Sequence, residues 1–83
     1  MKVIYKYSLI DTFAPAEGKV IHVGPDPKAQ ICVWMEVPSN AAPPVQRVFV
    51  VLGTGDTIPE TGAIHVGSWR DGPFMWHAYE MVN

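Results

Sequence analysis

One tetrapeptide occurs twice in this chain, and the repeat limits the folds that the chain can adopt. Ile-His-Val-Gly at residues 21–24 returns at residues 64–67, and Trp34 and Trp76 follow the two copies ten and nine residues later. A strand, a turn and a second strand account for each copy together with its tryptophan. We therefore expect two similar hairpins in which both tryptophans are largely buried.

The whole chain, residues 1–83, is predicted to be a single all-β domain that contains these two hairpins at about 18–37 and 62–82. Alternating, β-branched and aromatic residues between turn signals predict about six strands. The expected strands cover residues 2–9, 19–23, 29–37, 45–52, 63–69 and 73–82. They predict a small antiparallel sheet curled as a sandwich or partial barrel, with a possible short helix near residues 11–17.

Composition and charge narrow the classes of function. The chain is 48% hydrophobic and 17% charged, against a usual charged share of about 25%. Apolar surface that so small a domain cannot cover predicts a homo-oligomer, a dimer or larger, with a compact monomer as the alternative. The six basic residues are scattered singly and the net charge is −2, which disfavours binding to duplex nucleic acid. With one cysteine and no membrane-length apolar run, the chain is expected in the cytoplasm.

The loop at residues 53–60 is the first candidate for ligand binding. Its glycines let the backbone turn N–H groups toward an anion, and Thr54 and Thr57 add hydroxyl donors. The loop has neither the lysine nor the following helix of a nucleotide-binding P-loop. An ordinary bulged turn, followed by a connection that Pro59 stiffens, is the alternative interpretation.

Isolated cationic and aromatic side chains are the second candidates. Arg47 interrupts an apolar strand, so it is expected to contact a ligand, to pair with a carboxylate such as Glu36 or Glu80, or to guard a sheet edge. Trp69 and Arg70 stand at a predicted turn, where both could reach a ligand or a partner.

His22 and His65 occupy the same place in the two copies of the repeat, either as paired ligand contacts or as solvent-facing strand residues. No spacing typical of a metal site, a cofactor site or a nucleophilic active site is present. Cys32 lies in mid-strand among apolar residues, where a thiol is inert. We therefore predict a protein that is not an enzyme and has no catalytic residues, metal or cofactor.

Several segments resemble a family of small tailed-phage proteins of unknown function. They are the opening MKVIYKY, IHVG followed by CVWMEV, the loop GTGDTIP, a Gly-Ser-Trp and the closing FMWHAYE, which together span nearly the whole chain. The resemblance implies no binding residues, but it implies a context in the host cytoplasm. Small phage proteins of this kind often counteract a host defence.

Two functional hypotheses of different classes follow, with a third behind them. In the first, the protein sequesters a small nucleotide-like signal in a pocket through Arg47, Arg70, Trp69, Thr54, Thr57, His22 and His65. In the second, it is a protein–protein inhibitor of a host defence protein and presents a strand edge or the turn at Trp69 and Arg70. A phage structural or accessory protein without a ligand is the further alternative.

Overall fold

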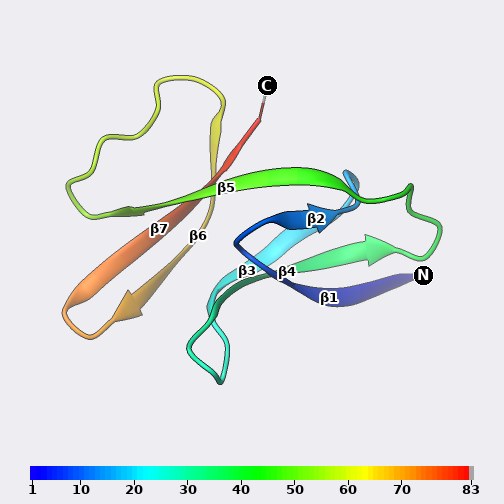
Figure 1. The fold of residues 1–83 in the computed structure, drawn as a ribbon, viewed down its shortest axis with the longest axis horizontal. Coiled ribbons are helices and arrows are strands. Elements are labelled where there is room, and N and C mark those ends of the chain that lie inside the picture. Colours follow the sequence, from blue (N-terminus) through cyan, green and yellow to red (C-terminus); the bar gives the residue numbers. More distant parts are fainter. Residues whose placement is uncertain (83) are drawn as a thin grey trace.

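The computed structural model describes residues 1–82 and consists of strands joined by turns and loops (Figure 1). The strands are β1 (Lys2–Ser8), β2 (Thr12–Ala14), β3 (Lys19–Pro25), β4 (Ile31–Pro38), β5 (Val45–Gly53), β6 (Ala63–Asp71) and β7 (Phe74–Met81). The described part contains no helix, and hence no helix that is long and apolar enough to cross a membrane. The predicted all-β class is confirmed.

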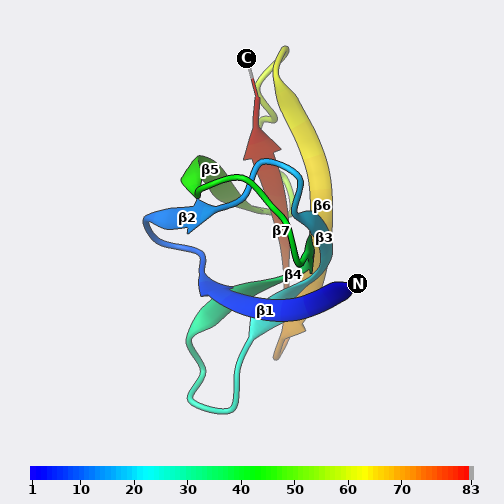
Figure 2. The ribbon, with the colours of Figure 1, turned by 90° about the vertical axis from the view of Figure 1, so that its right-hand side faces the viewer.

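The strands form two antiparallel sheets. One has the order β1-β4-β3 and the other has the order β2-β5-β7-β6. In the side view of Figure 2, β2 and β5 lie above β1 and β4, and β3 lies next to β6. No ladder of hydrogen bonds joins β3 to β6 in the part of the chain described, so the sheets meet at this seam without closing into a barrel. The result is the predicted sandwich-like arrangement.

The prediction of a short helix near residues 11–17 is wrong, because three of these residues form β2. Thr12 is buried, and its hydroxyl donates to the carbonyl oxygens of Ser8 (2.7 Å) and Leu9 (3.1 Å) instead of capping a helix. Asp11 has a positive φ of 54°, which turns the chain before β2. Pairing of Thr12 with Arg47 on β5 then holds the segment extended, so the sheets contain seven strands instead of six.

The six strands that the sequence predicted are all present, with small shifts at their ends. Strands β3 and β6 each extend two residues further than predicted, and β4 begins two residues later, at Ile31, because Ala29 has a positive φ of 65° in the preceding turn. Asp26 organises this turn, since its Oδ1 accepts hydrogen bonds from the backbone N–H groups of Lys28 (2.9 Å) and Gln30 (3.0 Å). In an Asx turn of this kind, a short polar side chain accepts hydrogen bonds from the backbone and so stabilises the turn.

The core lies between the two sheets and is small. Alternate residues of β4 (Val33, Met35 and Val37) point into it and are buried, while Cys32 is buried on the other side of the same strand. Glu36, on the same side as Cys32, is half-buried, so β4 is fully buried on one face and only partly on the other. Trp69 is the most buried tryptophan, with 8% of its surface exposed. Trp34 and Trp76 are half-buried.

The two copies of the tetrapeptide lie in β3 and β6, the strands that meet at the seam. Each strand contains an irregularity of the β-bulge type, at Ile21 in β3 and at Val66 in β6, so the extra residue falls at different positions of the two copies. The seam is close at Gly67, where a side-chain Cβ would lie 3.2 Å from the Cβ of Val23. Glycine is therefore needed there for the approach of one strand to the other.

Candidate ligand-binding site

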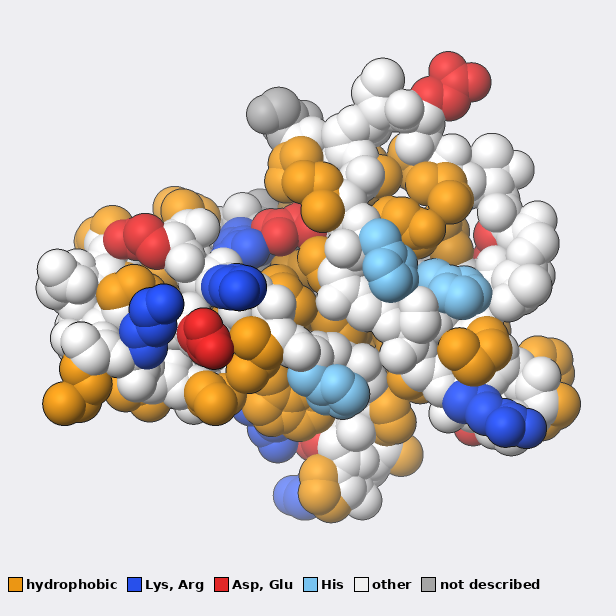
Figure 3. Space-filling model, turned by 180° about the vertical axis from the view of Figure 1, so that it is seen from behind, with side chains coloured by type: hydrophobic (Ala, Val, Ile, Leu, Met, Phe, Trp, Pro, Cys, Tyr) orange, Lys and Arg blue, Asp and Glu red, His pale blue; other side chains and the backbone are white. Residues whose placement is uncertain are grey.

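A row of four hydrogen-bonded polar side chains crosses the outer face of the β5-β7-β6 sheet. His65 Nε2 and His77 Nδ1 each lie 2.8 Å from the hydroxyl of Ser68, so this hydroxyl bridges two imidazoles. The other ring nitrogen of His77 lies 3.2 Å from the Thr54 hydroxyl. We call Thr54, His77, Ser68 and His65 the histidine row. Histidine side chains lie close together on the face drawn in Figure 3.

The bulge at Val66 brings His65 and Ser68 to the same face. Residues three apart in a regular strand point to opposite faces, because side chains alternate. The extra residue at Val66 shifts the alternation by one position, so that His65 and Ser68 point to the same face. The register shows this directly, since His65 pairs with Tyr79 and Ser68 pairs with His77 on the neighbouring strand. The histidine row thus depends on an irregularity of β6.

The turn after β5 places Thr54 at the end of the row. The N–H of Asp56 donates to the carbonyl oxygen of Gly53 (3.0 Å), and the carboxylate of Asp56 accepts the N–H of Gly53 (2.8 Å). Gly55 lies between them with a φ of 100°, a conformation that side-chain-bearing residues rarely adopt. The turn that the sequence predicted at this loop is present, and it also orients a hydroxyl toward His77.

Two hollows flank this turn. One, of about 220 Å³, lies on the histidine side and is lined by the turn together with Leu52, Ile58, His77 and Tyr79. The other, of about 430 Å³, is lined by the same turn and by Pro73, Phe74, Met75 and Trp76. Because Gly53, Thr54 and Asp56 line both hollows, one ligand could lie across the turn.

The chemistry of the row is that of a donor and acceptor chain. A hydroxyl has a single hydrogen, so Ser68 donates to one imidazole and accepts a hydrogen bond from the other. Both ring nitrogens of His77 bond within the row, so an anion placed beside the row would meet Nδ1 of His65, the ring nitrogen outside these bonds.

The structure places the residues predicted from the sequence in different parts of the molecule. Thr54 and His65 belong to the row, and Thr57 lies exposed in the same loop. Trp69 lies on the opposite face of β6 and is buried in the core. His22 is on β3, where its ring centroid lies 5.1 Å from that of Trp34 and the two rings are tilted by 54°. The structure therefore does not place His22 and His65 as a pair within one row.

The two arginines also separate. Arg70 is exposed at the end of β6, and its Nε donates to the carbonyl oxygen of Gly72 (3.0 Å). Arg47 forms a two-pronged ion pair with Glu80, at 2.7 Å from Nε and 2.8 Å from Nη2. Its third nitrogen donates to the carbonyl oxygens of Pro15 (3.0 Å) and Gly18 (2.7 Å). Of the alternatives for Arg47, pairing with the carboxylate of Glu80 is the one that the structure contains.

Ser68 is the central residue of the row that the sequence reasoning missed. The signal that could have found it is Gly67, since glycine inside a strand often marks a bulge or a close approach of two backbones. Within residues 1–82, no group of three or more His, Cys, Asp or Glu side chains is placed to hold a metal ion.

Comparison with known proteins gives a family and no function. A family model matches residues 1–83, and its description is Domain of unknown function (DUF7352). No curated protein and no solved structure matches the chain.

Proposed function

This chain belongs to the DUF7352 family, and we propose that it is a non-enzymatic binding protein that captures a small nucleotide-like ligand across the turn after β5. The histidine row is the observation that carries the proposal. In the context that the tailed-phage resemblance implies, the ligand is a signal of a host defence and the protein acts by sequestering it.

The phosphate end of the ligand belongs beside the histidine row. His65 supplies Nδ1, the ring nitrogen outside the hydrogen bonds of the row, and Thr54 supplies a hydroxyl, while His77 is bonded through both ring nitrogens and orients its neighbours. A hydrogen bond to a charged group contributes about 1.5–3 kcal/mol, so two such contacts supply about 3–6 kcal/mol of the roughly 8 kcal/mol that micromolar binding requires. Asp56 lines both hollows, and its negative charge opposes an anion at the turn itself, so the phosphate belongs at the far end of the row, beside His65.

The base belongs in the second hollow. The rings of Phe74 and Trp76 lie there with their centroids 6.2 Å apart and an interplanar angle of 32°. Stacking of a base on an aromatic side chain contributes about 1–3 kcal/mol and tolerates any base. The two hollows together therefore suit a ligand with one anionic and one flat apolar end.

Thermal shift with a panel of nucleotides, and with inorganic phosphate alone, tests the proposal. A nucleotide at a hundred times its dissociation constant should stabilise the protein by about 2.7 kcal/mol. His77→Ala should weaken binding at least tenfold, because it removes the residue that links Thr54 to Ser68 in the row. His22→Ala is the matched control, since His22 lies on β3 outside the row. Absence of any shift, or equal losses in both variants, would contradict the proposal.

A protein partner is the second candidate, and the tip of the β6-β7 hairpin favours it. Phe74 is 61% exposed there, and the cation of Arg70 lies on the same hairpin. Aromatic residues and arginine are the usual anchors of protein interfaces. Under this alternative, Phe74→Ser and Arg70→Ala would each weaken binding of a host protein, while His77→Ala would not.

A further inference from the structure

The molecule exposes more surface than a monomer of its mass normally does. Its accessible surface is 5660 Å², whereas the scaling for folded monomers, 6.3 times the mass to the power 0.73, gives about 4900 Å² for 9.2 kDa. Its radius of gyration is 13.0 Å, against about 12 Å for a compact chain of this length. The difference in surface, roughly 700 Å², is close to the 800 Å² or so that each partner buries in a standard interface.

An open strand edge lies within this surface. Strand β2 pairs with β5 only from Val45 to Arg47, while β7 pairs with the other side of β5 from Val48 to Gly53. In the described part of the chain, the β2 side of residues 48–53 has no strand beside it. Its backbone N–H and C=O groups are thus available to a further strand.

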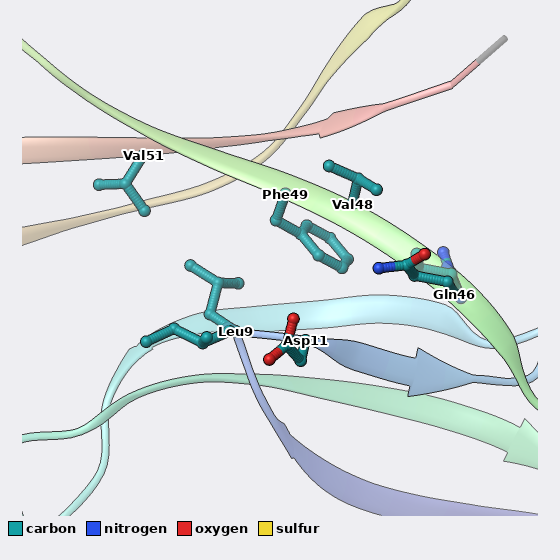
Figure 4. Close-up of a pocket in the computed structure, with 8 residues that line it drawn as sticks. Leu9, Asp11, Gln46, Val48, Phe49 and Val51 are labelled. Atoms are coloured by element: carbon teal, nitrogen blue, oxygen red, sulfur yellow. The ribbon is translucent and has the colours of Figure 1, made fainter.

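A groove accompanies this edge. A hollow of about 360 Å³ lies between β5 and the connection from β1 to β2, and its lining combines the apolar Leu9, Ile10, Val48, Phe49 and Val51 with the polar Asp11, Gln46 and Arg47. In Figure 4, Phe49 points from β5 toward Leu9, and Val48 lies on the other side of the strand. Strands that add to a sheet edge gain main-chain hydrogen bonds and place alternate side chains in such grooves.

Charge distinguishes this edge from the outer edge of β1. The outer edge of β1 carries Lys2 and Lys6, and lysines on an edge oppose pairing with another strand. Residues 48–52 of β5 read Val-Phe-Val-Val-Leu and carry no charge. A two-fold pairing of β5 with itself therefore brings no like charges together.

We infer that a second copy of this chain docks on the open edge of β5, antiparallel, through residues 48–52. A two-fold axis perpendicular to the sheet pairs Val50 with its own copy and keeps the same faces of the two sheets together. Pairing ends where β2 already occupies the edge, at Arg47. The joined sheet carries both histidine rows on one face, and the dimer does not depend on the proposed ligand.

Light scattering on the ligand-free protein tests the inference. The wild-type protein should have the mass of a dimer at micromolar concentration. Val48→Lys should raise the dissociation constant at least tenfold, because it places a lysine beside the paired edge. Val45→Lys is the matched control: Val45 has the same exposure (47% against 48%) on the same strand, but β2 already pairs with it. A monomeric wild type, or a dimer that Val48→Lys leaves intact, would overturn the inference.

Cross-linking at the two-fold axis gives a second measurement. In a Val50→Cys variant, the two introduced thiols face each other at about 5 Å between Cβ atoms, within reach of a short thiol cross-linker. The native Cys32 is buried and leaves the background low. Covalent dimer from Val50→Cys, but not from Val45→Cys, supports the antiparallel register. Equal yields from both variants, or none from Val50→Cys, would refute it.

Discussion

Removal of the Arg47 side chain should be among the most destabilising single changes in this protein. Arg47 and Glu80 are 11% and 13% exposed, and the guanidinium also holds the carbonyl oxygens of Pro15 and Gly18. It therefore ties β5 to β7 and to the turn before β3. Arg47→Ala leaves a largely buried carboxylate without its partner and removes one donor from the carbonyls of Pro15 and Gly18, of which Pro15 still accepts the N–H of Gly18.

The magnitude follows from this geometry. Breaking a buried ion pair by removing one partner costs about 3–5 kcal/mol. A domain of 83 residues has a total stability of about 4–12 kcal/mol at 0.05–0.15 kcal/mol per residue. The melting temperature should then fall by at least about 12 °C, since 1 kcal/mol corresponds to roughly 4–8 °C for a domain of this size.

Urea unfolding followed by tryptophan fluorescence measures the loss. Arg70→Ala is the matched control, because Arg70 is exposed and bonds only to the carbonyl of Gly72 among the hydrogen bonds of the described residues. It should change the stability by less than about 0.5 kcal/mol. Arg47→Met combined with Glu80→Leu should recover part of the loss, since no buried charge then remains unpaired. An Arg47→Ala protein as stable as the wild type would refute the structural role assigned to Arg47.

Three further predictions concern the seam, the turn before β4 and the thiol. Gly67→Ala should lower the free energy of unfolding in urea by about 1–3 kcal/mol, because the added Cβ would meet Val23. Gly24→Ala in the other copy should lower it less, because its Cβ would meet mainly the movable ring of His22. Equal losses in the two variants would contradict a tight seam. Hydrogen bonds lower the pKa of Asp26, first the one from the N–H of Gln30 and then those from Lys6 and Lys28. The contribution of Asp26 to stability is therefore present above about pH 4, the pKa of an unfolded aspartate, and is lost as the pH falls through its pKa in the folded protein. Asp26→Ala should thus be less stable than wild type at pH 7, and thermal unfolding should show the difference shrinking below about pH 4; a constant difference would count against this origin. Burial, followed by the charge of Asp26, raises the pKa of the Cys32 thiol, so a thiol reagent at pH 7 should react with it only when the protein unfolds; rapid labelling of the folded protein would show that the β4 environment is open.

Most of the strands could be predicted from the sequence, because the alternation of side chains that indicates a strand is visible within a few neighbouring residues. Alternation predicted a strand at residues 2–9, and the structure has β1 there, with Val3, Tyr5 and Tyr7 paired with the core-facing Val37, Met35 and Val33 of β4. Residues 11–17 were misjudged for the opposite reason. Their extended form depends on pairing with β5, more than 30 residues away, and no local propensity reports such a partner.

The residues of the candidate site were likewise only partly predictable from the sequence. The sequence singled out Thr54 and His65, because a glycine-rich loop and a repeated histidine are visible in one dimension. The part that Ser68 and His77 play required the bulge at Val66, whose position is set by how β6 pairs with β7. Trp69 was placed at a surface turn, whereas the register puts it opposite Trp76 on the core side of β6.

The sequence by itself determined the all-β class, the six longer strands and the loop at residues 53–60, since each follows from periodicity, glycine or proline within a short window. Only the tertiary structure decided which carboxylate pairs with Arg47, where the two copies of the repeat meet, and which histidines share a face. Those outcomes depend on register and on contacts between distant strands. A shift of one residue moves a side chain to the opposite face of a sheet, and the pairing of the whole fold sets that shift.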